Sequence, residues 1–332
     1  MVKQVKIDLN KILGLARADF KNKENGLGKQ MIRGSEIYIP SKPEDYIYWP
    51  NSPFHIMTGV PGIPFGKIIQ IAGKPDSGKS THAMKFMKLA QDQGHTVVLW
   101  DPEEKFSVTR FEKHFGGSAP DLLVVTNKVI LEGGDMCVAL ISSILDLYKN
   151  QKVLLCWDSV GGSIAKSENS KNLRESNQMA EAAKDNGKLM RGLVSLSEEF
   201  RKDNTKEHRL AVLLINQTYS NIGAPGQKEA GGQKVEFHSS LILQLQRKAD
   251  LFKVRDKVKR KIGITTRARV KKNHLFDGED TIAEMILDIS AGGISINSKD
   301  GAAKLAPEAV TKGGEELIEI ADDAEWEEQV ST

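Results

Sequence analysis

The feature that most constrains the fold is residues 67–94, where an apolar run leads directly into a glycine-rich motif and then a helical pattern. The sequence reads KIIQIA, then GKPDSGKS, then THAMKFMKLAQDQ with Gly94 behind it. The middle piece, Gly73 to Ser80, matches G-x-x-x-x-G-K-[ST] in the strand-then-helix context of a phosphate-binding loop. A Gly-rich turn that binds nothing is the alternative. The flanking strand and helix favour a nucleotide site.

Each fixed position of this motif has a physical task. Gly73 and Gly78 let backbone N–H groups turn toward phosphate oxygens at the N-terminus of a helix. Lys79 is expected to neutralise the β and γ phosphates of ATP, and Ser80 is expected to bind Mg²⁺. The residues expected to hold ATP in this motif are Gly73, Lys74, Pro75, Asp76, Ser77, Gly78, Lys79, Ser80 and Thr81.

Acidic residues follow two further apolar runs and extend the expected site. KVLLCWDS contains Asp158, which we expect to hold Mg²⁺ directly or through its waters. TVVLWDPEEKF offers Asp101, Glu103 and Glu104, and a carboxylate there can orient the water that attacks a phosphate. Two alternatives stay open: Asp158 as an ordinary turn residue or cap, and Glu103 or Glu104 as a solvated loop charge.

Apolar runs of strand length alternate with helical patterns through the middle of the chain. The strand candidates are 67–73, 96–101, 121–127, 152–158, 210–217 and 241–247, and a long amphipathic helix is expected between Glu175 and Arg201. This alternation is typical of an α/β fold with a mostly parallel central sheet flanked by helices. We predict one core at 52–295, an N-terminal arm and linker at 1–51, and a short, disordered acidic tail at 296–332.

Charge is divided unevenly along the chain. The net charge is +3, yet eight acidic residues and no Lys or Arg follow Lys312, which leaves residues 1–312 at +11. The tail is either a solvated end or, in a nucleic-acid binder, an electrostatic competitor for the basic surface. Cys137 and Cys156 lack metal or C-x-x-C spacing, so we expect buried free thiols.

The chain offers no targeting or membrane signal. Its longest apolar runs are too short to cross a bilayer, and MVKQVKIDLN lacks the apolar segment of a secretory signal. We therefore expect a cytoplasmic protein without a membrane partner, in the host cytoplasm if it is phage-encoded.

The ordered motifs together resemble the RecA-type DNA strand-exchange recombinases, including those of bacteriophages, over about residues 52–294. The resemblance is carried by SPFHIMTGVPGIPFGKIIQIAG before the phosphate loop, the D-x-E of LWDPE, WDSVGGS, LLINQ with a loop closed by Gly231-Gly232 and QKVEF, TRARVKKN, and ISAGGI. The phosphate loop alone is a strong motif. The order and spacing of all the segments make the resemblance specific.

The resemblance implies an ATPase that uses ATP with Mg²⁺, forms a filament on single-stranded DNA and exchanges strands with duplex DNA. It implies that Glu103 activates water, that Gln217 senses the γ phosphate, and that residues 1–51 dock onto the next subunit. Two loops, about 163–184 and 218–233, would face the DNA, and no regular structure is expected for most of the second. The expected DNA contacts are Met179, Lys184, Arg191, Lys228, Gly231 and Gly232. Loader or single-strand-binding proteins are further candidate partners.

This chain departs from the pattern of the family at several positions. Lys272 matches a lysine that reaches the neighbour's ATP, but His274 stands where bacterial members have a second one. Arg110 stands where an aromatic residue that stacks on adenine is expected. Little sequence follows Ile294, where bacterial members continue with a folded domain that helps capture duplex DNA. Capture would then use other residues or other proteins.

Other interpretations stay open beside this resemblance. A ring-forming helicase or motor of the same fold would share Lys79, Asp158 and Glu103, and a low-turnover ATP-binding accessory protein on DNA would share the binding residues. The basic run at 253–272 is either a solvated hairpin or, in part, a second path for DNA. Gly231 and Gly232 are either phosphate contacts or only a turn before an expected strand, QKVEF.

Overall fold

The computed structural model describes residues 39–166, 168, 178–199, 207–220, 227–255, 258–276, 282–291, 293–301 and 329–330. The chain divides into two units, Met1–Pro40 and Ser41–Thr332. The first unit lies almost entirely outside the described residues, and so does most of the predicted N-terminal arm. The second unit begins before the predicted core boundary at residue 52, because Ile47 is fully buried in its core.

One large sheet runs through the second unit in the order β12-β11-β10-β9-β3-β7-β6-β4-β5. Its parallel strands are β3 (Ile68–Gly73), β4 (Thr96–Trp100), β5 (Leu122–Val125), β6 (Val153–Asp158), β7 (Leu210–Ser220) and β9 (Leu241–Arg255). Antiparallel strands β10 (Val258–Asn273), β11 (Glu284–Ser290) and β12 (Gly293–Ile296) continue it beyond β9. The predicted strands and the mostly parallel sheet are confirmed.

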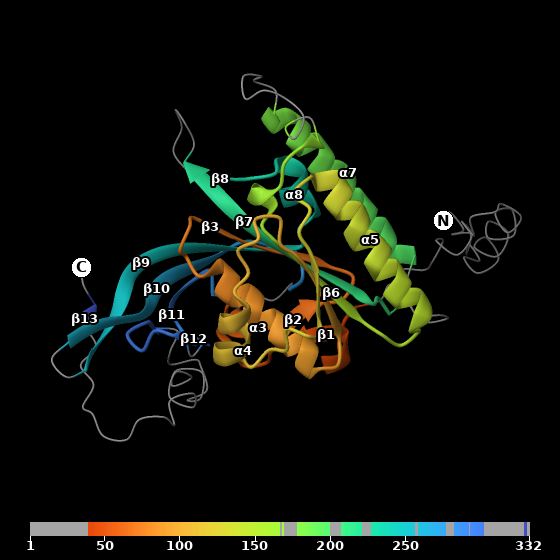
Figure 1. The fold of residues 1–332 in the computed structure, drawn as a ribbon. Helices are drawn as coiled ribbons and strands as arrows, with labels where there is room; N and C mark the ends of the chain where they lie inside the picture. Colours follow the sequence, from red (N-terminus) through yellow and green to blue (C-terminus); the bar gives the residue numbers. More distant parts are fainter. Residues whose placement is uncertain are drawn as a thin grey trace, which may run out of the picture. The chain divides into compact units, whose positions relative to one another are not determined.

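Four short strands complete the sheets. β1 (Tyr46–Tyr48) and β2 (Gly62–Pro64) pair with each other in a separate two-stranded sheet. β8 (Gln227–Glu229) pairs with the end of β7, and β13 (Gln329–Val330) pairs with β9. The long antiparallel pair β9 and β10 extends away from the helices in Figure 1, and the basic run at 253–272 lies in these two strands.

Helices cover both faces of the parallel sheet (Figure 1). One apolar cluster joins the sheet to α2 (Pro53–Thr58), α3 (Lys79–Asp92) and α4 (Val108–Phe115). A second cluster joins the other face to α5 (Ile130–Leu147), α7 (Gln178–Glu199) and α8 (Gln233–His238). The 3-10 turns η3 (Pro43–Asp45) and η4 (Val160–Gly162) lie in connections. This two-faced burial explains why the strands are apolar along their whole length.

The second cluster contains two tryptophans near the carboxyl ends of neighbouring strands. Trp100 and Trp157 pair in register across β4 and β6. Their rings stack with centroids 4.2 Å apart and planes 16° apart. Each indole N–H is satisfied: Trp100 donates to the carbonyl oxygen of Asn127 (2.7 Å) and Trp157 donates to Ser163 Oγ (3.0 Å). The stack holds together the strand ends that precede Asp101 and Asp158.

The predictions of an amphipathic helix and of two buried free cysteines are confirmed. α7 buries Leu189, Leu193 and Leu196 along one side, as the helical spacing predicts. Cys137 and Cys156 are both free and buried. Among the described residues, no helix combines the length and the apolarity needed to span a membrane.

The segment after β7 is more regular than the sequence suggests. Thr218, Tyr219 and Ser220 continue the strand and pair with β8, where irregular structure was predicted. QKVEF is the helix α8 and not a strand, so that prediction was wrong. The helix forms because Gly232 starts it with a positive φ of 82° and Val235 packs into the second apolar cluster.

Residues just beyond the predicted core boundary at 295 are bonded to β11. Asp300 Oδ2 accepts from the backbone N–H of Ile286 (2.7 Å), and Asn297 Nδ2 donates to both carboxylate oxygens of Asp288 (2.9 and 3.0 Å). These bonds attach residues 297–300 to β11. Apart from 296–301 and β13, the predicted acidic tail lies outside the described residues.

Candidate functional site

The candidate site lies where the parallel strands end. Gly73, the last residue of β3, pairs in register with Gln217 of β7. Asp158 is the last residue of β6, and Asp101 directly follows β4. Ligands of open α/β sheets bind at these carboxyl ends. The fold therefore brings the predicted phosphate loop, acidic residues and sensor to one edge of the sheet.

The phosphate loop has the backbone geometry that its motif requires. Gly78 has a φ of 93° and is the N-cap of α3, and Asp76 has a φ of 58°. A Cβ at Gly78 would lie 2.3 Å from Ile289 Cδ1, and a Cβ at Gly73 would lie 2.3 Å from the carbonyl oxygen of Leu245. Close packing therefore requires glycine at both positions, and at Gly78 the positive φ requires it as well.

Lys79 is held inside this loop. Its side chain is about nine-tenths buried, and Nζ donates to the carbonyl oxygen of Lys74 (2.7 Å). Burial lowers the pKa of Lys79, while nearby carboxylates, Asp158 foremost, oppose that shift. An ammonium group held in this way is placed to meet phosphate oxygens.

Ser80 and Asp158 form the candidate Mg²⁺ position. The Ser80 hydroxyl hydrogen-bonds to the Asp158 carboxylate, and burial raises the pKa of Asp158. A hydroxyl and a carboxylate side by side offer the oxygen ligands that Mg²⁺ prefers when it is bound together with phosphates. The residues therefore fit the ion that the sequence predicts.

Glu103 is the acidic residue that reaches the site from the β4 side. Its Oε1 accepts from Ser159 Oγ (2.6 Å) and from Gln217 Nε2 (3.4 Å), and Lys105 forms an ion pair with its Oε2. Burial raises the pKa of Glu103, but hydrogen bonds from Lys105 and Ser159 outweigh it and hold the pKa below its usual value. Glu104 is exposed and does not line the cavity that contains Glu103.

Three residues that position Glu103 were not predicted from the sequence. Ser159 orients the carboxylate, and the peptide bond between Asp158 and Ser159 is cis. Gly162 leaves room for Glu103, since a Cβ there would lie 2.2 Å from Glu103 Cγ. Lys105 supplies the charge beside it. Ser159 and Gly162 both lie in the run WDSVGGS. The small residues that follow the strand-end aspartate in this run were the only sequence signal for their roles.

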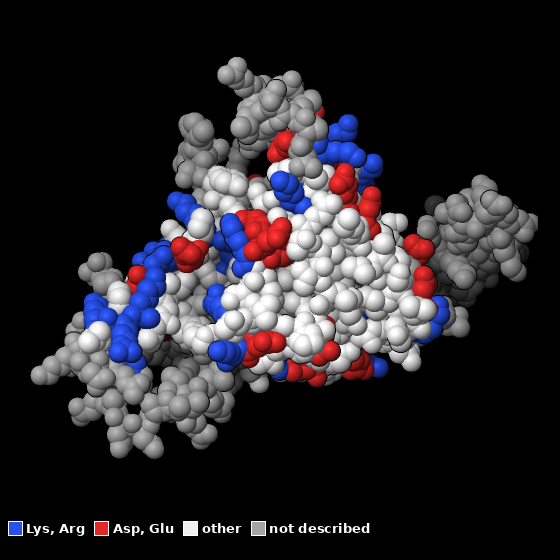
Figure 2. Space-filling model, in the orientation of Figure 1, with Lys and Arg blue, Asp and Glu red and all other residues white. Residues whose placement is uncertain are grey.

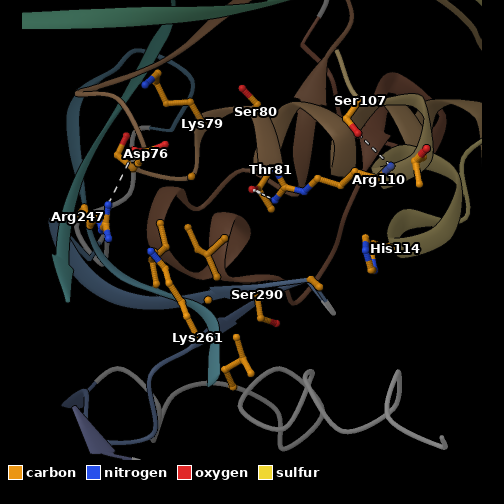
Figure 3. A pocket seen from close by; sticks show the side chains of 18 residues that line it. Asp76, Lys79, Ser80, Thr81, Ser107, Arg110, His114, Arg247, Lys261 and Ser290 are labelled. Atoms are coloured by element: carbon orange, nitrogen blue, oxygen red, sulfur yellow. Dashed lines mark hydrogen bonds and ion pairs between the residues drawn. The ribbon is translucent and has the colours of Figure 1, made fainter. Parts of the chain in front are cut away.

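Two cavities meet at the phosphate loop. The smaller, about 180 Å³, is lined by Lys79, Ser80, Glu103, Asp158 and Gln217 among others. The larger, about 580 Å³, opens between the phosphate loop, α4 and the strands β9, β10 and β11 (Figure 3). The smaller cavity contains the groups suited to phosphate chemistry. The larger one has room for the rest of a nucleotide.

Arg110 faces the larger cavity, whereas its neighbour Phe111 does not. Arg110 Nη2 donates to Thr81 Oγ1 (2.6 Å), a contact drawn in Figure 3, and its guanidinium lies 5.9 Å from the ring centroid of Phe115. Phe111 is fully buried in the first apolar cluster. Of these two residues, only Arg110 can therefore contact a base in this cavity.

Three of the predicted DNA contacts lie on α7, and a fourth, from the second loop, lies in β8. Lys184 and Arg191 are exposed on this helix. Met179 lies in the first turn of α7, and Lys228 lies in β8, but the side chains of both fall outside the described residues. The structure therefore places two exposed cations on the α7 side of the molecule, away from both nucleotide cavities.

Gly231 and Gly232 close the second loop against α7. Each has a φ of 82°. A Cβ at Gly231 would lie 2.7 Å from Val160 Cγ1, and one at Gly232 would lie 2.8 Å from Ala183 Cβ. The turn interpretation of the glycine pair is therefore supported by the structure, because L residues with side chains would be strained and crowded there.

The two predicted interface residues lie outside both nucleotide cavities. Lys272 Nζ donates to the carbonyl oxygens of Glu236 and Phe237 (3.0 Å each) at the end of α8. His274 is exposed, and its backbone N–H donates to the carbonyl oxygen of Ser240. Neither residue lines the cavities next to Lys79. Any contact of theirs with ATP would have to involve another copy of the chain.

A basic surface follows the β9–β10 hairpin. Figure 2 shows a stripe of Lys and Arg along this part of the molecule. The exposed basic residues of the two strands are Arg247, Lys248, Lys259, Arg260, Lys261, Arg269 and Lys271. Some are paired internally, as Arg247 and Lys261 are with Asp250. The stripe gives this side of the molecule a field that favours polyanions.

Comparison with known proteins agrees with the geometry. The family "RecA N-terminal domain" matches residues 47–292. Protein RecA of Ureaplasma parvum serovar 3 is 32% identical over 224 residues, which cover 66% of this chain and 60% of that protein. Protein RecA of Malacoplasma penetrans is 30% identical over 65% of this chain and 60% of that protein. Protein RecA of Clostridioides difficile is 28% identical over 80% and 69%.

Proposed function

The chain belongs to the RecA family, and we propose that it is an ATP-dependent DNA recombinase that assembles as a helical filament on single-stranded DNA. The matched region spans about 60% of the length of the first two relatives above. The proposed filament pairs its bound strand with homologous duplex DNA and promotes strand exchange. Hydrolysis of ATP with Mg²⁺ resets the filament.

The observation that carries this proposal is the contact of Glu103 with Gln217 beside the phosphate loop. A carboxylate with a lowered pKa is ionised at neutral pH and can accept a proton from an attacking water. Lys79 would neutralise phosphate charge from the other side of the cavity. Mg²⁺ held by Ser80 and Asp158 would supply further charge neutralisation at the phosphates. These groups together suit hydrolysis better than storage of ATP.

Gln217 also provides a link from nucleotide to DNA. Its carbonyl oxygen accepts from the backbone N–H of Ala230 (2.9 Å), and Asn216 Nδ2 donates to the carbonyl oxygen of Ala230 (2.9 Å). Ala230 directly precedes the Gly231-Gly232 turn. A shift of the sensor would therefore be transmitted to the turn that we propose contacts DNA phosphates.

The exposed edge of the sheet supports assembly with a second copy of the chain. Among the described residues β5 is the last strand at this edge, and Leu123 and Val124 are exposed on it. A groove of about 630 Å³ beside it is lined by Val124, Met136 and Leu140 among others. An apolar edge strand next to a groove is a template for pairing with another segment. We assign it to the neighbouring subunit of the filament.

Electron microscopy with single-stranded DNA and a slowly hydrolysed ATP analogue tests the proposal most directly. Helical filaments are expected, together with ATP hydrolysis that depends on single-stranded DNA. Lys79→Ala should abolish both, because the phosphate charge is then no longer neutralised. Hexameric rings that unwind a forked duplex would replace the proposal by a helicase. DNA binding without hydrolysis would replace it by an accessory protein.

A further inference from the structure

The strand β10 carries an irregularity next to the second loop. Val270 pairs with Leu243 of β9 and Lys272 pairs with Ile242, so Lys271 is an extra residue with no partner on β9. Such a bulge turns the side chain of the extra residue out of the alternating pattern of the strand. Lys271 and Lys272, although adjacent, consequently both contact the segment at 229–237.

Lys271 joins two acidic residues that belong to different elements of that segment. Its Nζ lies 2.8 and 2.7 Å from the two carboxylate oxygens of Glu229 at the end of β8, and 3.1 Å from Glu236 Oε1 in α8. The Glu229 side chain is only 6% exposed and also accepts from Gln244 Nε2 (2.9 Å). A carboxylate this buried requires such partners, because an unpaired one would be costly.

These contacts surround the turn at the end of the second loop. Glu229 pairs with Thr218, the residue after Gln217. On the far side of the Gly231-Gly232 turn, Glu236 belongs to the helix whose last carbonyl oxygens bind Lys272. Lys271 therefore connects both ends of the turn to β10, and it does so next to the residue predicted to act across the subunit interface.

We propose that Lys271 is a positioning residue, which fixes the Gly231-Gly232 turn and α8 to β10 so that Gln217, the turn and Lys272 move together. The inference rests on the proposed function, because it assigns a role within the coupling of ATP to DNA. Lys271 lines neither nucleotide cavity. It acts by holding the carboxylates of Glu229 and Glu236, which belong to β8 and α8 on either side of the Gly231-Gly232 turn.

The opposite possibility is that Lys271 is simply a cation that attracts DNA phosphates. The two roles predict opposite results for Glu229→Gln. If only the electrostatic field matters, removal of a negative charge beside the loop should strengthen DNA binding. If Glu229 and Lys271 hold the turn, the same substitution should weaken binding, since the turn loses its attachment.

The test compares Lys271→Met, Glu229→Gln and the double variant with the full-length wild-type chain. We expect the single-stranded DNA concentration for half-maximal stimulation of ATPase to rise about tenfold in each single variant, and no further in the double variant. The hydrolysis rate without DNA should not change. The salt dependence of DNA affinity should keep its slope, whereas loss of a phosphate contact would reduce the slope by about one.

Lys271→Arg and Lys149→Met are the matched controls. Arginine keeps both ion pairs and should retain wild-type stimulation, and Lys149 is an exposed lysine outside the site whose removal should have no effect. Tighter DNA binding by Glu229→Gln, additive effects in the double variant, or a Lys271→Met variant equal to Lys149→Met would each overturn the inference. A wild-type chain without DNA-stimulated hydrolysis would instead refute the proposed function itself.

Discussion

The proposed nucleotide end of the candidate site, around Lys79, and its proposed DNA end, on α7, hold their charges in different ways. At the nucleotide end Lys79 is buried and Asp158 is largely withdrawn from water, and burial shifts the pKa of both groups. At the DNA end Lys184 and Arg191 are exposed on α7. Buried charges act at fixed positions and tolerate no loss of a partner, whereas exposed charges act through a field that salt screens. Chemistry and DNA affinity should therefore be separable by substitution.

The largest effect is expected at the nucleotide end, from Glu103→Gln. The amide cannot accept a proton from water, so single-turnover ATP hydrolysis should fall by about 10²- to 10⁴-fold. Binding of ATP and of DNA should remain, because the phosphate loop and the basic surfaces are unchanged. Glu104→Gln, at the exposed neighbour, is the control and should hydrolyse ATP at nearly the wild-type rate. Equal losses in both variants would contradict the assignment of Glu103.

The buried helix behind the phosphate loop should make stability depend on pH. His82 is fully buried in α3, and burial lowers its pKa from 6.5 to about 4. The unfolded chain therefore binds this proton more readily, so the stabilisation is complete above about pH 6.5 and is lost as pH falls toward 4. The loss should reach about 3 kcal/mol in the free energy of unfolding.

Urea unfolding at several pH values measures this dependence. His82→Met should flatten the decline between pH 6.5 and 4, although His95, whose pKa is also lowered to about 4 by burial, should leave part of it. His114→Gln serves as the control, because His114 is exposed. An unchanged decline in the His82→Met variant would show that other groups produce the pH dependence.

At the DNA end a glycine should matter through packing. Gly232→Ala places a Cβ 2.8 Å from Ala183 Cβ at a φ of 82°, and should lower the free energy of unfolding by about 1–3 kcal/mol. Gly192→Ala should have the opposite effect, because a Cβ at this exposed position of α7 would meet nothing within 4 Å beyond its chain neighbours and the local helix backbone. It should stabilise by up to about 1 kcal/mol. Urea unfolding of both variants measures the two changes in the free energy of unfolding. Equal changes in Gly232→Ala and Gly192→Ala would contradict the packing argument for Gly232.

The smallest effect is expected from Gln217→Ala, because Gln217 lies between the nucleotide end and the proposed DNA end. Gln217→Ala should leave ATP affinity nearly unchanged while reducing, by about fivefold, the factor by which ATP strengthens DNA binding. The reason is that the side chain contacts Glu103 while its backbone contacts Ala230. Titration of single-stranded DNA with and without ATP measures this factor. If the factor stays at the wild-type value, the second loop, 218–233, is not coupled to the nucleotide through Gln217.

The nucleotide end could be predicted from the sequence because its signals are local. GKPDSGKS follows a strand and begins a helix, so the motif itself defines the turn at Gly78. Asp158 and Glu103 lie at or just after the end of a strand, and Gln217 follows the apolar part of β7; parallel strands bring such positions together. The α/β order followed from the same alternation of apolar runs and helices.

The DNA end was predicted less well because its structure depends on contacts distant in sequence. α8 reads as a strand in isolation, but Gly232 and the packing of Val235 start a helix. The pairing of Thr218 with Glu229 needs Lys271 and Gln244 to neutralise and hold a nearly buried carboxylate. The bulge at Lys271 has no signature in VKKN, since it appears only in the register against β9.

The tryptophan stack gives the molecule its own optical reporter. Two indoles 4.2 Å apart and nearly parallel are close enough for their excited states to mix, which should produce a paired signal in far-ultraviolet circular dichroism. Trp100 directly precedes Asp101, and Trp157 directly precedes Asp158. Any change in the spacing of β4 and β6 when a ligand binds beside Asp101 and Asp158 would alter that signal. Occupancy of the site could thus be followed without a label.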